Sequence, residues 1–280
     1  MISIKDFSFK YQNSSINAIS NLNLNIGDGD FVGITGTSGA GKTTLTFALN
    51  GIIPQKIKGD FYGEVRIDGL DTVEHEAEEF ARGVGEVFQD IDSQMVASVV
   101  EDEIFFGLEN FGIAHDEIEV RLNKVLRELG IEELRDREIS SLSGGQKQKV
   151  AIAAILALEP RVIVLDEPTG ELDPESSREI FELLSRLNRE KGITVVIVEQ
   201  KIMLLCEYVK HLVVLNKGRL QFYGTPADIA GAIPLFKQLG INVPRVVELS
   251  SMLIASGLYK GKVTLTVKEA EQMVKEVLSL

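Results

Sequence analysis

Cysteine, basic charge and long apolar runs are all scarce in this sequence of 280 residues. Its single cysteine, Cys206, cannot form a disulfide within the chain, which agrees with a reducing compartment. No apolar run approaches the roughly 18 residues that a membrane-spanning helix needs, so we predict no such helix. The first residues, MISIKDFSFKY, lack a basic stretch followed by an apolar one, so we expect no export signal.

Basic side chains are also outnumbered, because 29 Lys and Arg against 42 Asp and Glu leave a net charge of −13. Binding to nucleic acid depends on Lys and Arg, so this composition argues against nucleic acid as a partner. The charge is uneven: residues 88–140 hold 14 acidic and 5 basic side chains, and residues 226–280 hold 5 and 6. We therefore expect a separate acidic surface in the first segment and a separate module in the second.

What the sequence does contain is ordinary globular composition with two kinds of strand pattern. Alternation of apolar and polar residues predicts half-exposed strands over 2–9, 18–26 and 63–69. Uninterrupted apolar runs predict buried parallel strands over 31–35, 162–165, 194–198 and 211–215. Helices are predicted over 42–50, 98–137, 146–158 and 180–187. Strands that alternate with helices indicate an α/β fold with a parallel sheet.

A glycine-rich segment, GTSGAGKT, follows the first buried strand and satisfies G-x-x-x-x-G-K-[ST]. Backbone N–H groups of such a loop cradle phosphate, and the following helix adds a favourable dipole. Lys42 would reach the β- and γ-phosphates, and the Thr43 hydroxyl would ligate Mg²⁺. A flexible glycine turn is the alternative, but the strand and helix on either side favour a nucleoside triphosphate site. The predicted ligands are Gly36, Thr37, Ser38, Gly39, Ala40, Gly41, Lys42, Thr43 and Thr44.

Two adjacent carboxylates, Asp166 and Glu167, end the buried strand 162–165. Ligands of α/β proteins bind at this edge of the sheet, beyond the carboxyl ends of the strands. Asp166 would help to hold Mg²⁺, and Glu167 could polarise the attacking water. A surface turn is the alternative for an isolated Asp-Glu pair, and it becomes improbable beside a phosphate loop.

The segment Leu142-Ser143-Gly144-Gly145-Gln146 opens a predicted helix and is a second potential phosphate-binding device. Ser143 by itself would more often be a helix cap. With the two motifs above, the segment makes residues 1–225 resemble the nucleotide-binding domain of ABC transporters. That resemblance implies a P-loop NTPase fold, with a RecA-like parallel sheet, an antiparallel β subdomain and a helical subdomain at about 88–155. It also implies two domains that sandwich two ATP molecules, each Ser143–Gln146 segment facing the partner's phosphate loop.

The resemblance assigns three further residues. Tyr11 matches the aromatic that stacks on adenine, although packing within a strand is the usual role of such a residue. Gln89 matches the glutamine that senses Mg²⁺ and the attacking water, with a solvated turn amide as the alternative. Asp173 matches the loop that crosses to the partner subunit. Asp173 followed by Pro174 is also a favourable start for a helix, so both interpretations can hold together.

One position departs from the family. A histidine normally follows the strand 194–198 and contacts the γ-phosphate, whereas here the alignment places Gln200. A neutral amide donates a hydrogen bond but cannot become cationic. We therefore expect ATP binding to persist and hydrolysis to be slow. His75, His115 and His211 lie elsewhere in the sequence and are predicted to be surface residues.

The segment 88–110 resembles the ATPases of energy-coupling-factor (ECF) importers, which drive uptake of vitamins and of cobalt or nickel ions. Gln94 matches their second glutamine, and residues 234–270 resemble their C-terminal extension. This implies a subunit at the cytoplasmic face of the cell membrane, with a transmembrane coupling subunit and a substrate-binding membrane subunit as partners. A second ATPase subunit is implied as well, and Gln200 favours a paralogous heterodimer. The extension 226–280 would support dimerisation.

Residues 90–109 contain six carboxylates and no Lys or Arg. Such a run is either a solvated face or, on the resemblance, a groove for basic residues of the membrane partner. The sequence leaves open the ATPase of another importer type and a weakly hydrolysing regulatory subunit. A non-transport ABC ATPase acting on DNA or ribosomes is disfavoured, because the chain has no heptad run, no second motif set and no basic surface.

Overall fold

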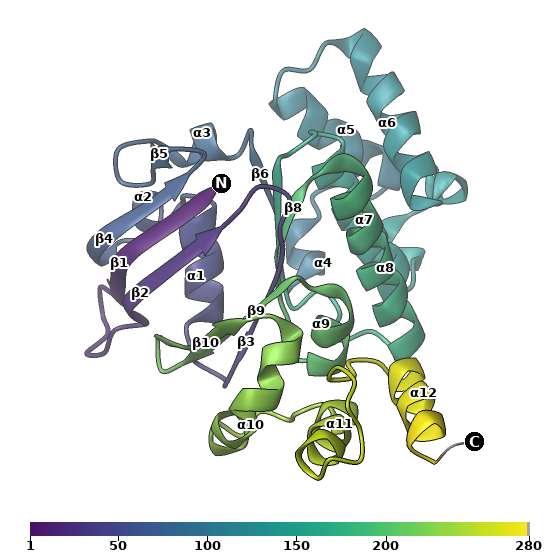
Figure 1. Ribbon diagram of the computed structural model, residues 1–280. Coiled ribbons are helices and arrows are strands. Elements are labelled where there is room, and N and C mark those ends of the chain that lie inside the picture. The colour runs from purple at the N-terminus through teal and green to yellow at the C-terminus, as the bar shows by residue number, and fades with distance from the viewer. Residues whose placement is uncertain (279–280) are drawn as a thin grey trace.

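The computed structural model describes residues 1–278, and its central element is a six-stranded sheet in the order β10-β9-β3-β8-β7-β6 (Figure 1). Its strands are β3 (Phe31–Gly36), β6 (Val84–Val87), β7 (Val162–Asp166), β8 (Thr194–Val198), β9 (His211–Asn216) and β10 (Arg219–Gly224). Neighbouring strands are parallel from β9 to β6, and β10 alone runs antiparallel to its neighbour. The predicted α/β fold with a parallel sheet is confirmed.

Both faces of this sheet are covered, which explains its uninterrupted apolar runs. Val162 and Val164 of β7 belong to one hydrophobic cluster, shared with a second sheet. Ile163 and Leu165 belong to the other cluster, shared with the helices. Successive side chains of a strand point to opposite faces, so a strand buried on both faces needs apolar residues throughout.

The second sheet is antiparallel, with the order β2-β1-β4-β5. Its strands are β1 (Ile2–Tyr11), β2 (Ile19–Ile26), β4 (Gly59–Ile67) and β5 (Leu70–Asp71). The helix α1 (Lys42–Leu49) lies beside it in Figure 1, and its buried residues Leu45 and Leu49 share a cluster with the sheet. The strand predicted over 63–69 begins earlier, at Gly59, because pairing with β1 continues as far as Tyr11.

The acidic stretch predicted as helical from 98 to 137 forms two separate helices, α5 (Val100–Asn110) and α6 (His115–Leu129). Gly112, with a φ of 69°, provides the left-handed turn between them. They lie at the upper right of Figure 1, next to α7 (Gly144–Leu156), whereas the short α4 (Ile91–Gln94) lies nearer the centre of the view. Two further short helices, α2 (Ile52–Gln55) and α3 (Ala77–Phe80), connect strands of the antiparallel sheet and the core.

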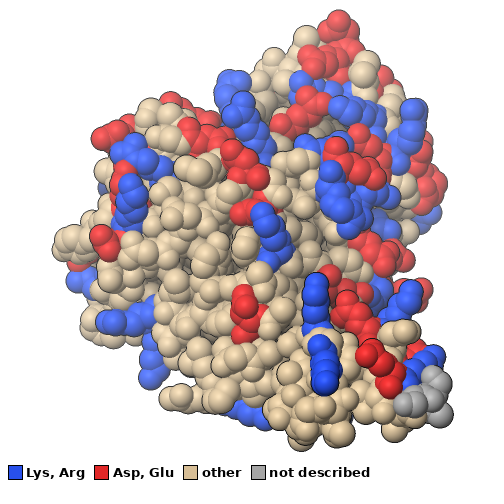
Figure 2. Space-filling view, viewed as in Figure 1, with Lys and Arg blue, Asp and Glu red and all other residues tan. Residues whose placement is uncertain are grey.

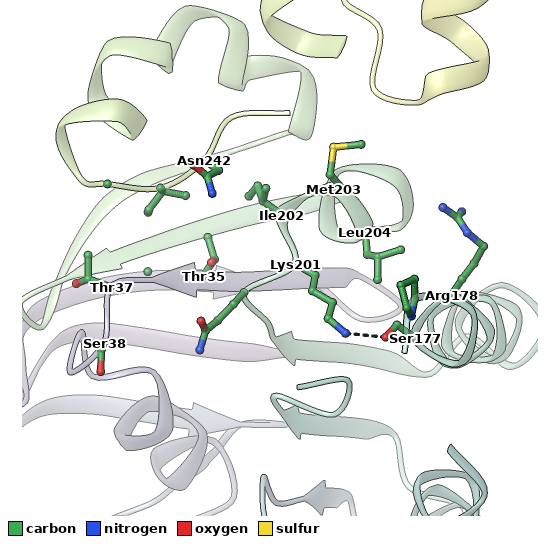
Figure 3. A pocket seen from close by; sticks show the side chains of 15 residues that line it. Thr35, Thr37, Ser38, Ser177, Arg178, Lys201, Ile202, Met203, Leu204 and Asn242 are labelled. Carbon is green, nitrogen blue, oxygen red and sulfur yellow. Dashed lines mark hydrogen bonds between the residues drawn. The ribbon is translucent and has the colours of Figure 1, made fainter. Parts of the chain in front are cut away.

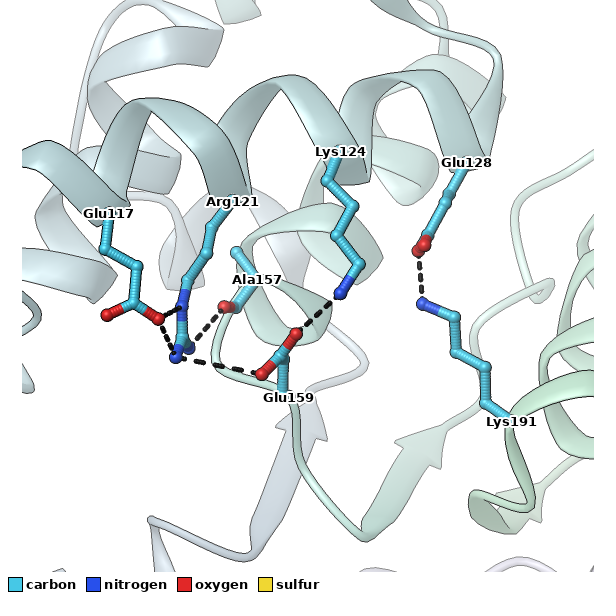
Figure 4. Close-up of polar contacts among 7 residues, drawn as sticks. All are labelled: Glu117, Arg121, Lys124, Glu128, Ala157, Glu159 and Lys191. Atoms are coloured by element: carbon cyan, nitrogen blue, oxygen red, sulfur yellow. Dashed lines mark hydrogen bonds and ion pairs between the residues drawn. The ribbon is translucent and has the colours of Figure 1, made fainter.

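Polar contacts tie α6 to the core of the molecule (Figure 4). Arg121 donates to the Ala157 carbonyl at 3.2 Å and lies 3.7 Å from the carboxylate of Glu159, which also pairs with Lys124 at 2.6 Å. The α8 helix (Pro174–Lys191) contributes a further ion pair, from Lys191 to Glu128. One side of the helical subdomain is therefore held to the ends of α7 and α8.

The C-terminal segment forms α10 (Ile229–Gln238), α11 (Arg245–Ala255) and α12 (Val267–Val277), and α9 (Ile202–Tyr208) precedes it. The segment expected to be a separate module shares part of the main core. Ile229, Phe236 and Val247 are buried in the larger hydrophobic cluster of the sheet and helices. The Phe236 ring also packs edge-on against Phe222 of β10, with centroids 5.3 Å apart. Within residues 1–278, none of the helices is long and apolar enough to span a membrane.

Candidate functional site

The loop 36–43 joins β3 to α1, and its shape depends on two glycines. A Cβ atom on Gly36 would lie 2.1 Å from the carbonyl oxygen of Leu215, and one on Gly41 would lie 2.4 Å from that of Ala18. Gly41 also has a φ of 95° and directly precedes α1. Only glycine tolerates this combination of left-handed backbone and close approach. The turn presents backbone N–H groups at the N-terminus of α1, which is the arrangement that binds phosphate.

Lys42 is folded back over this loop. Its side chain is only 8% exposed, and Nζ donates to the carbonyls of Gly36 and Thr37, both at 3.3 Å. Nζ also lies 3.8 Å from the Glu167 carboxylate. These contacts are long, so the ammonium can exchange them for phosphate oxygens that enter the loop.

Asp166, the last residue of β7, accepts a hydrogen bond of 2.6 Å from the Thr43 hydroxyl. Burial raises the pKa of the Asp166 carboxyl, and the neighbouring charge of Glu167 raises it further. A hydroxyl and a carboxylate that converge on one point are hard oxygen donors of the kind Mg²⁺ prefers, usually together with nucleotide phosphates. Thr43 and Asp166, two of the residues predicted from the sequence to hold Mg²⁺, are therefore in contact.

Glu167 sits in a strained backbone conformation and is held by two amides. Its φ of 49° is unusual for a residue other than glycine, and such strain collects at functional sites. Its carboxylate accepts hydrogen bonds from Nε2 of Gln200 at 2.8 Å and from Nε2 of Gln89 at 3.3 Å. All three residues predicted to be catalytic thus meet at one carboxylate.

A cavity of about 480 Å³ collects most of the predicted nucleotide ligands. It is lined by loop residues 38–44 together with Tyr11, Gln89, Glu167 and Gln200. The hydroxyl of Tyr11 is hydrogen-bonded to that of Thr44 at 2.9 Å, which fixes the ring at the cavity wall. Stacking of Tyr11 on adenine stays a prediction.

Among residues 1–278, Gln200 lines this cavity and no histidine does. His115 is exposed, as predicted, whereas His75 and His211 are half-buried. The predicted departure from the family is therefore a feature of the site itself. An amide at this position can donate to Glu167 or to a phosphate, without adding charge.

The segment Ser143–Gln146 lies outside that cavity. Ser143 caps α7, and the side chains of Ser143 and Gln146 each bond the other's backbone N–H. Asp173 likewise caps α8, accepting from the N–H groups of Glu175 and Ser176 at 2.9 and 3.0 Å. The helix-cap interpretations are confirmed for Ser143 and Asp173. The contacts of both residues with a partner's nucleotide stay predictions, and they require a second subunit.

Sequence reasoning missed several residues that shape the site. The Thr37 hydroxyl donates to Oδ1 of Asn216, at 3.1 Å, from the end of β9. Glu199 and Lys201 flank Gln200 and bind the loop that follows β7. Gln94 was not missed, because the resemblance identified it. It accepts from the Phe88 N–H and donates to the Glu86 carbonyl, both at 2.9 Å. The polar residues around Gln200 in an otherwise apolar stretch were the available signal.

Glu86 of β6 is a buried carboxyl near Asp166. Among the described residues its two oxygens have no hydrogen-bond partner, and the Thr46 hydroxyl donates instead to the Thr43 carbonyl at 2.9 Å. Burial raises the pKa of Glu86 to about 8, with a smaller contribution from the charge of Asp166. Glu86 is therefore largely protonated and neutral near pH 7.

Of the six carboxylates in segment 90–109, two form ion pairs and one is buried. Glu101 pairs with Arg135, Asp92 pairs with Lys147 at 2.6 Å, and Glu103 is buried against two backbone N–H groups. Figure 2 shows Lys and Arg interspersed with Asp and Glu over this part of the molecule. The expected acidic surface is therefore reduced at Asp92 and Glu101, which pair with basic residues from later in the chain. Asp90, Asp102 and Glu109 are exposed and form no ion pair within residues 1–278.

Sequence comparison finds one family and full-length relatives. The sequence profile of the family described as ABC transporter matches residues 19–170. A Pyrococcus horikoshii protein, named only by family as an ABC transporter ATP-binding protein, is 40% identical over 275 residues, covering 98% of this chain and 96% of that protein. An energy-coupling factor transporter ATP-binding protein of Clostridioides difficile is 39% identical over 284 residues, covering 100% of this chain and 99% of that protein.

Solved structures give the same result. A Clostridium perfringens protein, described as part of the ABC transporter complex cbiONQ, superposes with a TM-score of 0.76 at 32% identity, covering 89% of this chain and 98% of that chain. A dimeric ATP-binding cassette with ADP and phosphate bound, in a post-hydrolysis state, superposes with a TM-score of 0.69 at 29% identity, covering 81% and 99%. These likenesses confirm the predicted P-loop NTPase fold.

Proposed function

Because the chain belongs to the ABC transporter family and is an ATP-binding ATPase, we propose that it is the ATPase subunit of an energy-coupling-factor importer. It would drive uptake of a vitamin or a transition-metal ion through ATP-dependent closure of two ATPase subunits. The observation that carries this proposal is the full-length similarity to the ATP-binding protein of such a transporter in Clostridioides difficile. The likeness to a component of the cbiONQ complex supports it.

Residues 1–225 would form the nucleotide-binding domain and hold MgATP. The N–H groups of loop 36–43 and the Lys42 ammonium would bind the phosphates. Mg²⁺ fits the contact between the Thr43 hydroxyl and Asp166, with Gln89 as a third oxygen donor, and when bound it would neutralise phosphate charge. Tyr11 would line the adenine end of the site.

Glu167 is the residue best placed to act on the attacking water. Its carboxylate would accept the proton as the water oxygen bonds to the γ-phosphorus and ADP leaves. The amides of Gln89 and Gln200 hold that carboxylate in place from two sides. The second half of each site, Ser143–Gln146 and Asp173, would come from the other subunit.

The face that would meet the membrane subunit lies on α5. Asp102, Phe106 and Glu109 follow one another at helical spacing and are all exposed, with Phe106 at 45%. An apolar cavity of about 610 Å³, whose walls include Phe47, Ile52 and Phe88, lies beside the Gln89 loop. An aromatic flanked by carboxylates suits a basic amphipathic helix of a transmembrane subunit. The chain would then act at the cytoplasmic face of the cell membrane.

Charge reversal tests this docking face. Asp102→Lys with Glu109→Lys should weaken association with the membrane subunit and leave ATP binding unchanged, because neither residue has an ion-pair partner within residues 1–278. The matched control reverses Glu132 and Glu133, which are exposed elsewhere in the helical subdomain. Equal assembly of both variants would contradict the proposed face.

A weakly hydrolysing regulatory subunit is the second candidate, and Gln200 is the observation that favours it. A paralogous partner with a histidine at this position would then carry most of the turnover. Purification of the native membrane complex, followed by identification of its subunits, tests both proposals. An ECF-type coupling subunit with a small substrate-binding membrane protein is the expected composition. A complex built on a different type of membrane subunit would contradict the first proposal.

A further inference from the structure

The loop that carries Gln200 is bonded to the loop that carries Asp173, on both sides of Gln200. Glu199, only 1% exposed, accepts from the backbone N–H groups of Gln200 and Lys201 at 2.7 and 3.2 Å. Its other oxygen accepts from the Thr169 hydroxyl. Thr169 belongs to the turn between Glu167 and Asp173.

Lys201 makes the second connection between the two loops, and it uses all three of its N–H donors. Nζ donates to Oγ of Ser177 at 2.7 Å (Figure 3). It also donates to the Thr169 carbonyl at 2.6 Å and to the Leu172 carbonyl at 3.1 Å. An ammonium has three donors, and all three are used. Its acceptors lie at both ends of the turn 169–172 and in the first turns of α8.

Apolar packing alone does not explain the position of the Lys201 side chain. Lys201 lines an open cavity of about 640 Å³ whose far wall includes Asn242, and its side chain extends along the cavity floor toward Ser177 (Figure 3). No carboxylate within residues 1–278 forms an ion pair with Lys201. Charge-assisted hydrogen bonds to carbonyls therefore hold it, and such bonds are directional.

We propose that Lys201 is a positioning residue that makes the Asp173 loop follow the Gln200 loop. A shift of Gln200 on contact with the γ-phosphate would pull Lys201, and Lys201 would carry the Thr169 and Leu172 carbonyls with it. Asp173, the next residue after Leu172, would move toward or away from the partner subunit. The state of one nucleotide would thereby bias the geometry of the other site. This inference rests on the proposed roles of Gln200 and Asp173.

The test uses the full chain in its native complex and compares three variants. Lys201→Met removes all three hydrogen bonds at similar length, and we expect kcat to fall about 10- to 100-fold while the ATP dissociation constant changes less than about twofold. The Hill coefficient for ATP should fall toward 1. Lys201→Arg should recover much of kcat, because the guanidinium also donates to carbonyls. Lys210→Met, which removes an exposed lysine paired with Asp30, is the control.

Two further measurements keep the result interpretable. If Lys201→Met does not fold, Ser177→Ala removes one acceptor and leaves the charge, and it should lower kcat by a smaller factor. Gln200→Ala and Asp173→Ala report on the assignment beneath the inference. If both retain wild-type hydrolysis, the proposed site is wrong. If both slow hydrolysis while a folded Lys201→Met keeps wild-type kcat and cooperativity, the inference about Lys201 alone is overturned.

Discussion

The side-chain amide of Gln200 donates a 2.8 Å hydrogen bond to the carboxylate of Glu167. The residue that replaces a histidine of the family is therefore in direct contact with the residue expected to activate water. An amide donor holds the carboxylate without placing a positive charge beside it. The pair links the two positions on which the rate of hydrolysis should depend most.

Replacing Glu167 with Gln should abolish turnover and preserve ATP binding. A general base contributes roughly 10²–10⁴-fold to a rate, and the neutral amide cannot accept the proton. The ATP-bound dimer should accumulate, as measured by size-exclusion chromatography with ATP, alongside a phosphate-release assay. Lys42→Ala is the contrasting variant, because it should weaken ATP binding itself. Near wild-type hydrolysis by Glu167→Gln would refute the assignment of this base.

Installing the family histidine, Gln200→His, should raise the hydrolysis rate of the isolated chain. A charge-assisted hydrogen bond is about twice as strong as a neutral one, and a change of ~10²-fold needs only about 2.7 kcal/mol at the transition state. Steady-state kinetics of the isolated chain and of its assembled complex provide the measurement. An isolated chain already as fast as its complex, and not improved by the histidine, would mean that Gln200 substitutes fully.

The buried carboxyl of Glu86 should make stability depend on pH. Its pKa is about 8 in the folded protein, above the usual value of 4.5, so the folded state binds the proton more tightly than the unfolded state. The free energy of unfolding is then largest below about pH 4.5 for this group and falls as the pH rises toward 8.

Glu86→Gln should therefore raise the melting temperature at pH 8 to 9, with a gain that shrinks toward pH 5. The gain corresponds to roughly 2–4 kcal/mol at most, because it replaces a buried charge by a neutral amide. Thermal melts across this pH range measure it, with the exposed Glu190→Gln as the control. A pH-independent difference between Glu86→Gln and wild type would show that ionisation of Glu86 is not responsible.

The contacts of Glu159 with α6 should contribute little to stability. Its ion pair with Lys124 joins two side chains that are each about half exposed, at 52% and 51%. Such pairs contribute about 0–1 kcal/mol, so Glu159→Gln should lower the free energy of unfolding by less than about 1 kcal/mol. Urea denaturation checks this value. A loss of several kcal/mol would indicate that the contacts of Glu159 with α6 hold the helical subdomain in place.

The exposed apolar residues of α11 should stabilise the dimer when no nucleotide is present. Leu249 and Met252 lie three residues apart on this helix and are 40% and 70% exposed. Leu249→Glu with Met252→Glu should weaken the nucleotide-free dimer in analytical ultracentrifugation, while the folded monomer persists. Removal of the whole segment after Pro226 is a poor test, because Phe236 belongs to the main core. An unchanged dimer would contradict the proposed role of the extension.

The sequence by itself determined the parts of the site that are contiguous. Loop 36–43 and the pair Asp166 and Glu167 are short motifs whose spacing follows from backbone geometry, so their positions could be predicted residue by residue. The buried strands could be predicted because a sheet covered on both faces requires uninterrupted apolar runs. The edge strands β6 and β10 were missed, since their sequences, VGEV and RLQFYG, contain polar residues and glycine.

Only the tertiary structure decided which charges meet. Arg135 lies 34 residues after Glu101, and Lys147 lies 55 residues after Asp92, so two charges of a run that is acidic in sequence are neutralised only in the folded chain. Lys201 reaches the turn 169–172 because β8 and β7 are neighbours in the sheet. The C-terminal helices share the main core because Phe236 is buried in a cluster built largely from helices and strands that come earlier in the chain. Contacts between residues far apart in sequence carry no local pattern, and the fold alone brings them together.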